Sequence, residues 1–186
     1  MSHTVGIILT GGNSRRMGTD KASMIVAGKP MVVKVADALW EAGLHPVECQ
    51  GGDATTIEQF GLTVAADPEP GSGPLSAIRA ALERHADSDA VVVACDLVDL
   101  DGETVRALVD AGTDDSHPDV AAALSNGELH MISWWRAGTG SKLASLIDEG
   151  VDSYQAALDR LGAARVPVPA GVVRNVNTPD DLGPGE

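Results

Sequence analysis

The feature of this 186-residue sequence that most constrains its fold is an alternation of short apolar runs with longer segments of helical periodicity. The clearest runs are VGIIL at 5–9 and AVVVAC at 90–95. A fully apolar run of this length is typical of a parallel strand that is buried on both faces. The alternation therefore predicts an α/β fold, in which a mostly parallel sheet lies between two layers of helices.

The same alternation predicts the other elements of the chain. Further strands are expected at residues 23–26, 46–50, 62–66, 119–124, 130–135 and 164–168. Helices are expected between Pro30 and Gly43 and at residues 54–60, 73–86, 104–111, 142–147 and 153–161. Asn126 and Gly127 separate two of the strands and are typical of a two-residue hairpin turn, so we expect one antiparallel element. For the adjacent Trp134 and Trp135 we expect one core and one surface side chain.

The charge of the chain limits the classes of partner. Its formal net charge is −14, which argues against nucleic acid or an anionic membrane surface. Residues 1–34 differ from the rest, because they carry five basic residues and one acidic residue, a local balance of +4. A small basic region on an acidic protein suits a small anionic ligand, although solvation of a surface explains the charges equally well.

Cysteine usage and hydropathy indicate the compartment. Cys49 and Cys95 lie in apolar surroundings without metal-ligand spacing, so we expect buried free thiols in a reducing cytoplasm. The first residues lack the basic region and the cleavage site of a signal peptide. No apolar run approaches the ~18 residues that span a bilayer. We therefore expect a cytoplasmic protein without membrane contact, and no heptad or apolar stripe indicates its oligomeric state.

The stretch ILTGGNSRRMGTDKASM at 8–24 follows the first predicted strand. It is not a Walker A loop, because five residues separate Gly12 from Gly18 and Ala22 follows Lys21. It also lacks the G-x-G-x-x-G pattern of dinucleotide-binding folds. Both of the common nucleotide motifs are thus excluded by spacing.

Simple chemistry still makes this stretch a candidate phosphate cradle. The adjacent Gly11 and Gly12 let backbone N–H groups point inward without a Cβ atom in the way. Arg16 offers a planar fork for phosphate oxygens, and Lys21 offers a mobile positive charge. Ligands of open parallel sheets bind beyond the carboxyl ends of the strands, which is where the stretch lies. A phosphate cradle is therefore favoured over a basic turn.

Other polar residues follow predicted strands or stand in loops. Asp96 follows the most apolar strand, where a carboxylate either binds a metal or caps the next helix. Asp67 precedes a proline and suits either a turn or a sugar hydroxyl. Asn175 and Asn177 suit either a turn or a ligand. Gln50 ends the second core strand, where its amide could contact a base edge.

The residues LTGGNSRRMGTDK at 9–21 resemble the L-A-G-G-x-S-x-R-M-G-x-D-K signature of MobA-like nucleotidyltransferases, the molybdenum cofactor guanylyltransferases and their relatives. Thr10 stands where Ala is usual. The matching residues are Leu9, Gly11, Gly12, Ser14, Arg16, Met17, Gly18, Asp20 and Lys21. The resemblance implies a three-layer αβα Rossmann-like fold, dependence on a nucleoside triphosphate, and Mg²⁺ as cofactor.

Three further stretches resemble the same family in the same order. ADPEPGSGPLSAIRAAL resembles its D-x-x-P-G-x-G-P-L-A-G-I segment, which implies that Asp67 and Gly73 lie by the nucleoside. VVVACDL resembles its strand ending in Cys-Asp, which implies Asp96 as metal ligand. RNVNTPDDL resembles its N-x-N-T-P-x-D-L segment, which implies that Asn175 and Asn177 face the metal and the phosphates.

The resemblance thus implies a complete site within one domain over residues 1–186. The part at about 1–100 is expected to bind nucleotide, and the part at about 101–182 the acceptor. The expected nucleotide-binding residues are Leu9, Thr10, Gly11, Gly12, Lys21, Gln50, Asp67, Gly73 and Asp96. The expected catalytic residues are Arg16, Lys21 and Asp96, the metal ligands Asp96 and Asn177, and the acceptor-binding residues Asn175 and Asn177.

The implied reaction is transfer of GMP from GTP to molybdopterin with release of pyrophosphate. One departure keeps two alternatives open, since the family usually has C-D-x-P-x-x-P where this chain has CDLVDLDG at 95–102. Both prolines are missing there, and Asp99 and Asp101 are added. The alternatives are a related transferase with another base or acceptor, and a non-catalytic nucleotide-binding homologue.

Overall fold

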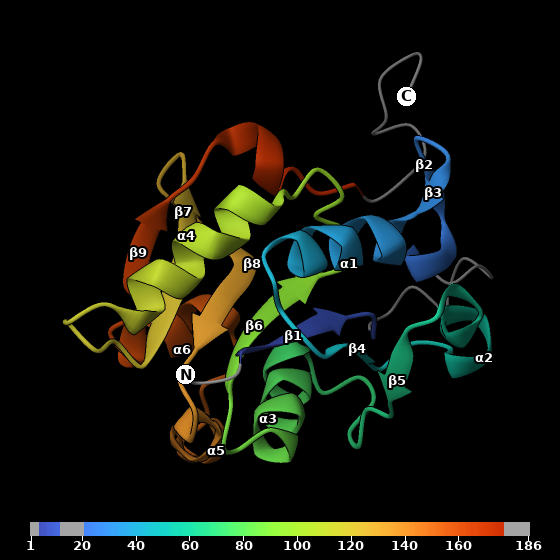
Figure 1. Ribbon diagram of the computed structural model, residues 1–186. Coiled ribbons are helices and arrows are strands. Elements are labelled where there is room, and N and C mark those ends of the chain that lie inside the picture. Colours follow the sequence, from blue (N-terminus) through green and yellow to red (C-terminus); the bar gives the residue numbers. More distant parts are fainter. Residues whose placement is uncertain (1–3, 12–20, 177–186) are drawn as a thin grey trace.

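The computed structural model describes residues 4–11 and 21–176. Within these residues, seven strands form one sheet in the spatial order β5-β4-β1-β6-β8-β7-β9 (Figure 1). The strands are β1 (Thr4–Leu9), β4 (Val47–Gln50), β5 (Thr63–Ala65), β6 (Asp89–Ala94), β7 (Val120–Ser125), β8 (Glu128–Trp135) and β9 (Ala164–Pro167). The small strands β2 (Ile25–Val26) and β3 (Lys29–Pro30) pair separately.

The sheet is mostly parallel, as the sequence predicts. β1 pairs in parallel with both β4 and β6, and β4 with β5. β8 runs antiparallel to its neighbours β6 and β7, and β7 pairs in parallel with β9. The hairpin between β7 and β8 turns at Asn126 and Gly127, whose φ angles of 51° and 82° are those of the predicted tight turn.

Helices cover both faces of the sheet, which makes three layers (Figure 1). α1 and α4 pack together on one face, and α3 and α5 pack together on the other, where α6 also lies. The helices are α1 (Met31–Glu41), α2 (Ala54–Ile57), α3 (Pro74–Arg84), α4 (Gly102–Thr113), α5 (Thr139–Asp148) and α6 (Tyr154–Arg160). Short 3₁₀ helices are η2 (Lys21–Ser23), η3 (Glu58–Phe60) and η4 (Ala170–Val173).

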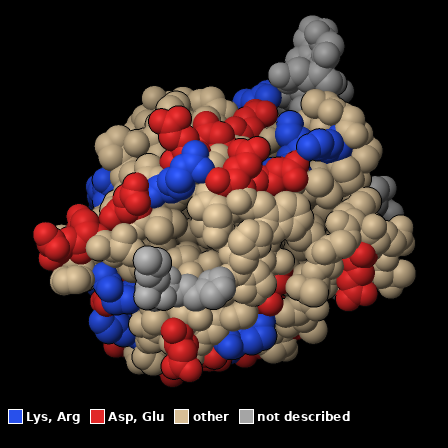
Figure 2. All heavy atoms as spheres, in the orientation of Figure 1, with Lys and Arg blue, Asp and Glu red and all other residues tan. Residues whose placement is uncertain are grey.

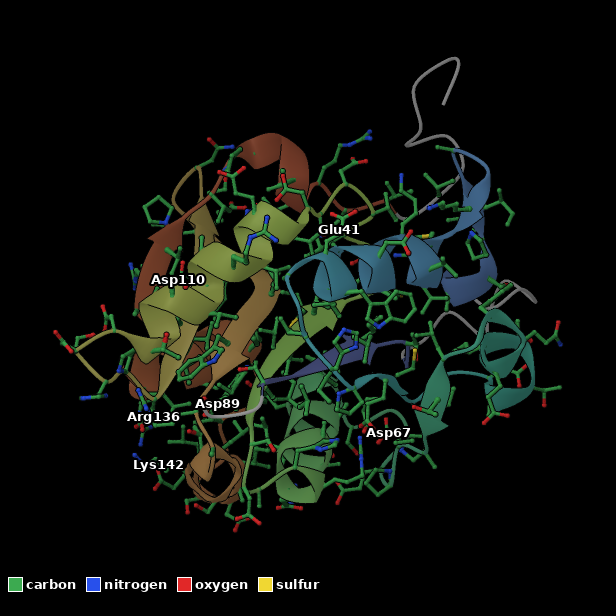
Figure 3. All side chains as sticks on the ribbon, in the orientation of Figure 1. Glu41, Asp67, Asp89, Asp110, Arg136 and Lys142 are labelled. Carbon is green, nitrogen blue, oxygen red and sulfur yellow. The ribbon has the colours of Figure 1, made fainter. Side chains whose placement is uncertain are left out.

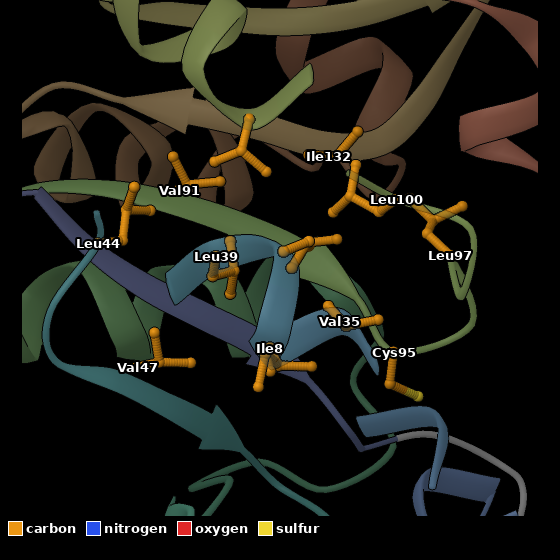
Figure 4. Close-up of a cluster of buried hydrophobic side chains, with 14 of the residues drawn as sticks. Ile8, Val35, Leu39, Leu44, Val47, Val91, Cys95, Leu97, Leu100 and Ile132 are labelled. Atoms are coloured by element: carbon orange, nitrogen blue, oxygen red, sulfur yellow. The ribbon is translucent and has the colours of Figure 1, made fainter. Parts of the chain in front are cut away.

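Each face of the sheet has its own apolar core. Under α1 and α4, Ile8 and Leu39 belong to the cluster that Figure 4 shows. On the other face, Ile7 and Ile78 belong to a second cluster. Successive residues of a strand point to opposite faces, so the apolar run of β1 supplies both cores. This is why the run is continuous rather than alternating.

The two tryptophans correct one expectation. Trp134 and Trp135 are both fully buried, so the prediction of one surface side chain is wrong. They lie on opposite faces of β8, Trp134 in one core and Trp135 in the other, because both faces are covered by helices. Cys49 and Cys95 are buried and not joined by a disulfide, as expected.

The acidic surface of the chain is visible over the helices on one face. Figure 2 shows acidic side chains over α1 and α4, with basic side chains between them. Exposed acids on these helices include Glu41, Glu103 and Asp110. Within the described residues, no helix is long and apolar enough to cross a membrane.

Candidate active site

The carboxyl ends of three neighbouring parallel strands meet at one edge of the sheet. In the register, Leu9 at the end of β1 lies between Gln50 of β4 and Ala94 of β6. The segments that follow these residues therefore leave the sheet side by side. They begin with Thr10, Gly51 and Cys95.

Backbone hydrogen bonds fix the start of the loop after β1. The N–H groups of Thr10 and Gly11 both donate to the carbonyl of Gln50, at 3.1 and 3.3 Å. The Thr10 hydroxyl donates to the Gly51 carbonyl at 2.7 Å. A Cβ atom on Gly51 would lie 3.0 Å from the Gly11 Cα, and its φ of +78° also favours glycine. Close approach of the two segments thus requires this glycine.

Lys21 and Asp96 form an ion pair at this edge. The Lys21 Nζ donates to the Asp96 Oδ2 at 3.0 Å, although 75 residues separate them. Their side chains are 20% and 21% exposed, so the pair is accessible from solvent but not fully solvated. Ala22, next to Lys21, is fully buried and belongs to the core under α1. The ion pair and the burial of Ala22 thereby hold the end of the cradle stretch beside Asp96.

The residues of the loop after Asp96 have three kinds of contact: core packing, an ion pair and a helix cap. Leu97 and Leu100 are buried in the core under α1 and α4. Asp99 accepts hydrogen bonds from Arg174. Asp101 caps α4, since its carboxylate accepts the N–H of Thr104 at 2.7 Å.

This division settles which acid caps the helix. The capping role that the sequence left open for Asp96 belongs to Asp101, which also explains why α4 begins at Gly102, two residues earlier than predicted. Asp96 has a different partner, the side chain of Lys21. Its carboxylate therefore remains the candidate for ligand chemistry.

A C-terminal segment joins the same edge. We call residues 173–176 the strap. The N–H of Val176 donates to the carbonyl of Asp96 at 3.0 Å, and the Val176 side chain is fully buried. Asn175 is exposed, and it lies one residue from this contact. The strap thus places residue 175 next to the backbone contact with Asp96, and a ligand role for the Asn175 side chain stays a prediction.

Asp67 and Gly73 lie between β5 and α3 along the chain. The Asp67 Oδ1 accepts the N–H of Glu69 at 3.0 Å, which is a local turn contact. Its Oδ2 lies 3.7 Å from the position that a Cβ on Gly11 would take, so Asp67 borders the loop after β1. Figure 3 shows Asp67 beside β5 and the N-terminal part of the α3 region. Gly73 precedes α3 with a φ of +87° and open space where a Cβ would lie.

Gln50 has partners that the sequence did not suggest. Its side chain is fully buried, donates through Nε2 to the Ala66 carbonyl at 3.2 Å, and accepts from Arg84 at 2.8 Å. Both ends of the amide are thus used within the protein. A base contact by Gln50 stays a prediction, while its carbonyl supports Thr10 and Gly11.

Glu48 continues this network on the same face of β4. Its carboxylate accepts from Arg84 and, at 3.0 Å, lies against the His85 ring. Burial acts to raise the pKa of Glu48, but the hydrogen bonds and charges of Arg84 and His85 outweigh it and hold this pKa below 4.5. Sequence reasoning missed the network, although a glutamate and a glutamine alternating with buried apolar residues in one strand were a signal for it.

Three of the predicted site residues fall outside the described part of the chain. Gly12, Arg16 and Asn177 lie outside the residues that the structure describes. Leu9 is buried at the end of β1. In residues 4–11 and 21–176, no cluster of three or more His, Cys, Asp or Glu side chains could hold a metal by itself. The edge therefore offers the ion pair of Asp96 and Lys21 and the beginning of a glycine loop, which Asp67 borders, and this set suits a phosphate ligand.

Comparison with solved structures shows what the fold is similar to. Molybdopterin-guanine dinucleotide biosynthesis protein A from Archaeoglobus fulgidus has a similar fold, with a TM-score of 0.74. The two sequences are 23% identical, and the match covers 95% of this chain and 94% of that chain. The three-layer fold is that of nucleotidyltransferases, as predicted.

Sequence comparison gives the family. Residues 6–164 match the MobA-like NTP transferase domain. A molybdenum cofactor guanylyltransferase from Cereibacter sphaeroides is 34% identical over 187 residues, covering 97% of this chain and 94% of the relative. A probable molybdenum cofactor guanylyltransferase from Pelotomaculum thermopropionicum is 39% identical over 110 residues, 59% of this chain and 53% of the relative. The chain belongs to the MobA-like NTP transferase family, as its motifs indicated.

Proposed function

We propose that this protein transfers GMP from GTP to molybdopterin and releases pyrophosphate, which yields a guanine dinucleotide form of the cofactor. The observation that carries the proposal is the ion pair between Lys21 and Asp96, beside the glycine loop that begins at Gly11. The choice of GTP and molybdopterin follows the relatives, which are named as molybdenum cofactor guanylyltransferases.

The loop after β1 binds the triphosphate in this proposal. The Gly11 N–H donates to the Gln50 carbonyl, so the expected phosphate donor of this pair is the Gly12 N–H, while Arg16 and Lys21 neutralise the phosphate charge. The hydrogen bonds of Thr10 to β4 keep the start of the loop in one place. Backbone that is fixed before the ligand arrives, as at Thr10 and Gly11, loses less conformational entropy on binding.

The nucleoside lies beside Asp67 and Gly73 in this proposal. Asp67 accepts from a sugar hydroxyl, since its carboxylate borders Gly11 and one oxygen faces that loop. Gly73 leaves open space before α3, so the backbone can approach the nucleoside closely.

Asp96 suits a Mg²⁺ ion whose remaining ligands come from the substrate and from water. Mg²⁺ is usually bound by one or two carboxylates together with phosphate oxygens and water, so a lone carboxylate beside a triphosphate site is sufficient. Asp96 and the amide of Asn177 would hold the ion, and the ion would add positive charge where negative charge develops on the α-phosphate. Lys21 then pairs with phosphate oxygens as well as with Asp96.

The transfer needs alignment more than proton chemistry. A phosphate oxygen of molybdopterin attacks the α-phosphorus of GTP in line, the bond to the β-phosphate breaks, and pyrophosphate leaves. The attacking oxygen is already anionic, so the chain need not supply a general base. Asn175 and Asn177 orient the acceptor, while Arg16 and Lys21 stabilise the charge on the transferred group.

Pyrophosphate release tests the proposal. The protein is incubated with Mg²⁺ and molybdopterin and either GTP or CTP, and with GTP but no acceptor. We expect release only with GTP and molybdopterin together, and calorimetry should show tighter binding of GTP than of CTP. Release with CTP would identify a related transferase, and GTP binding without any release would identify a non-catalytic homologue.

A further inference from the structure

We propose that the ion pair between Asp99 and Arg174 is a clamp that positions Asp96 for the transfer reaction. The inference rests on the proposed function and assigns a role to two residues outside the cradle and the metal site. Asp99 stands in the stretch where this chain departs from the proline-containing pattern of the family. Arg174 lies in the strap.

The clamp joins two segments that are 75 residues apart in the sequence. The Arg174 Nε and Nη2 both donate to the Asp99 Oδ2, at 3.0 and 2.8 Å. Two charge-assisted hydrogen bonds from one guanidinium group restrict orientation as well as distance. The side chains are 41% and 30% exposed, so the contact costs little desolvation and contributes little to global stability.

The same two segments meet again at Asp96. The Val176 N–H donates to the Asp96 carbonyl, two residues from Arg174. Val98 and Val176, which are 2% and 0% exposed, pack with Val26 and Met31 in a small separate core. The strap thus holds the backbone of Asp96, and the partly exposed clamp holds the strap to the loop after Asp96.

Leu97 and Leu100 fix only the inner side of the Asp96 loop, against the core under α1 and α4. A family member with two prolines in this loop restricts its backbone directly, because proline fixes φ. This chain has Val98 and Asp101 at those positions, where it gains a buried contact and a helix cap. Contacts with residues distant in the sequence therefore restrict the Asp96 loop here, in place of the two prolines.

The clamp geometry also argues that Asp99 is not a second metal ligand. Its Oδ2 already accepts two N–H donors of a permanently charged guanidinium group. A ligand role would require the pair to open. The two roles predict opposite results when Arg174 is changed. If Asp99 is a ligand, loss of Arg174 frees its carboxylate and activity is kept; if Asp99 belongs to the clamp, loss of Arg174 lowers activity.

The experiment compares Asp99→Asn, Arg174→Gln and the double variant with the wild-type protein. We expect kcat for GMP transfer to fall about ten-fold in each single variant, since small displacements of reacting groups can cost up to about a hundredfold. The double variant should lose no more than either single variant, and the KM for GTP and the thermal midpoint should stay unchanged. The charge-swapped variant, Asp99→Arg with Arg174→Asp, should recover part of the rate.

Asp159→Asn is the matched control. It removes the carboxylate from another exposed pair, in which Arg165 donates at 3.0 Å on the far side of the sheet from β1. We expect wild-type kcat for this variant. A kcat loss equal to that of Asp99→Asn would show a general charge effect and overturn the clamp.

Hydrogen exchange of the Val176 amide separates the clamp from the proposed function. Loss of the clamp should speed this exchange, because the strap opens more often, and Asp159→Asn should leave it unchanged. Unchanged exchange in both clamp variants would overturn the inference whatever the enzyme transfers. Faster Val176 exchange in the clamp variants of a protein that transfers no GMP would instead overturn the proposed function. Activity that is kept by Arg174→Gln but lost by Asp99→Asn would make Asp99 a ligand and refute the clamp.

Discussion

The two ends of strand β6 carry an aspartate each, and the two side chains serve different purposes. Asp89 begins the strand, is 5% exposed, and accepts the backbone N–H of Ala137 at 2.9 Å. Asp96 follows the end of the strand, remains in part exposed, and pairs with the ammonium group of Lys21. One carboxylate bonds to a neutral backbone group and the other to a mobile charge.

The surroundings of the two ends differ in the same way. At the Asp89 end, Arg136 donates to the carbonyls of Pro118 and Gly112, both at 3.0 Å, and its guanidinium lies 5.2 Å from the centre of the Trp134 ring. Figure 3 shows Asp89, Arg136 and Lys142 at this end. Asp89 and Arg136 are thus held by backbone groups and a ring, whereas Asp96 and Lys21 at the other end pair with each other and are in part exposed. Ligands of open parallel sheets bind at the carboxyl ends of the strands, which makes the Asp96 end the candidate site.

Replacing the carboxylate at the functional end should have the largest effect. We expect Asp96→Ala, and likewise Lys21→Ala, to lower the rate of pyrophosphate release about a thousandfold, which is typical for removal of one charge-stabilising group. The thermal midpoint should change little, since a partly exposed ion pair contributes about 0–1 kcal/mol. Near-normal turnover in both variants would contradict the roles assigned to the edge.

The opposite end should respond in stability rather than activity. In Gly112→Ala, the new Cβ would overlap Cδ2 and Cε3 of the buried Trp134, so α4 or the ring must shift. We expect a loss of about 3 kcal/mol in the free energy of unfolding, the upper part of the usual range for overpacking. Denaturant unfolding measures it. Gly171→Ala is the control, because open space surrounds that position, and an equal loss there would refute the packing argument.

The pairing of Lys21 with Asp96 shows what could be predicted from the sequence. The apolar runs placed Asp96 after a central strand and the cradle stretch after its neighbour, and the parallel arrangement then brought them to one edge. The hairpin at Asn126 was equally predictable, because the turn depends on two local residues. These predictions rest on local pattern and on one rule of sheet topology.

The contacts of Asp99 and Gln50 could not be predicted in this way. Asp99 pairs with a residue 75 positions away, and Arg84 reaches Gln50 from α3. Such contacts depend on the placement of a helix or loop in three dimensions, and an exposed arginine has many partners of similar energy. The burial of both Trp134 and Trp135 could have been predicted, because two helical layers leave neither face of β8 free.

Removal of the Asp89 carboxylate, at the start of β6, should have a moderate effect on stability. We expect Asp89→Ala to lower the free energy of unfolding by about 1–2 kcal/mol, because the Ala137 N–H loses its partner in a partly buried site. Asp89→Asn keeps an acceptor oxygen and should lose less. Turnover per folded molecule should equal that of the wild type in both variants. A large activity loss would erase the contrast between the two ends of β6.

The smallest expected effect concerns Glu48, a charged group that lies near the functional edge but serves structure. Its pKa is below 4.5 in the folded protein, so the unfolded chain binds protons more readily. The stability from this group is complete above about pH 5 and is lost as the pH falls through the folded pKa. We expect Glu48→Gln to flatten the fall of the thermal midpoint over that acidic range. Glu128→Gln, at an exposed glutamate of β8, should keep the wild-type slope; a flattened slope in both variants would show that Glu48 has no special partner.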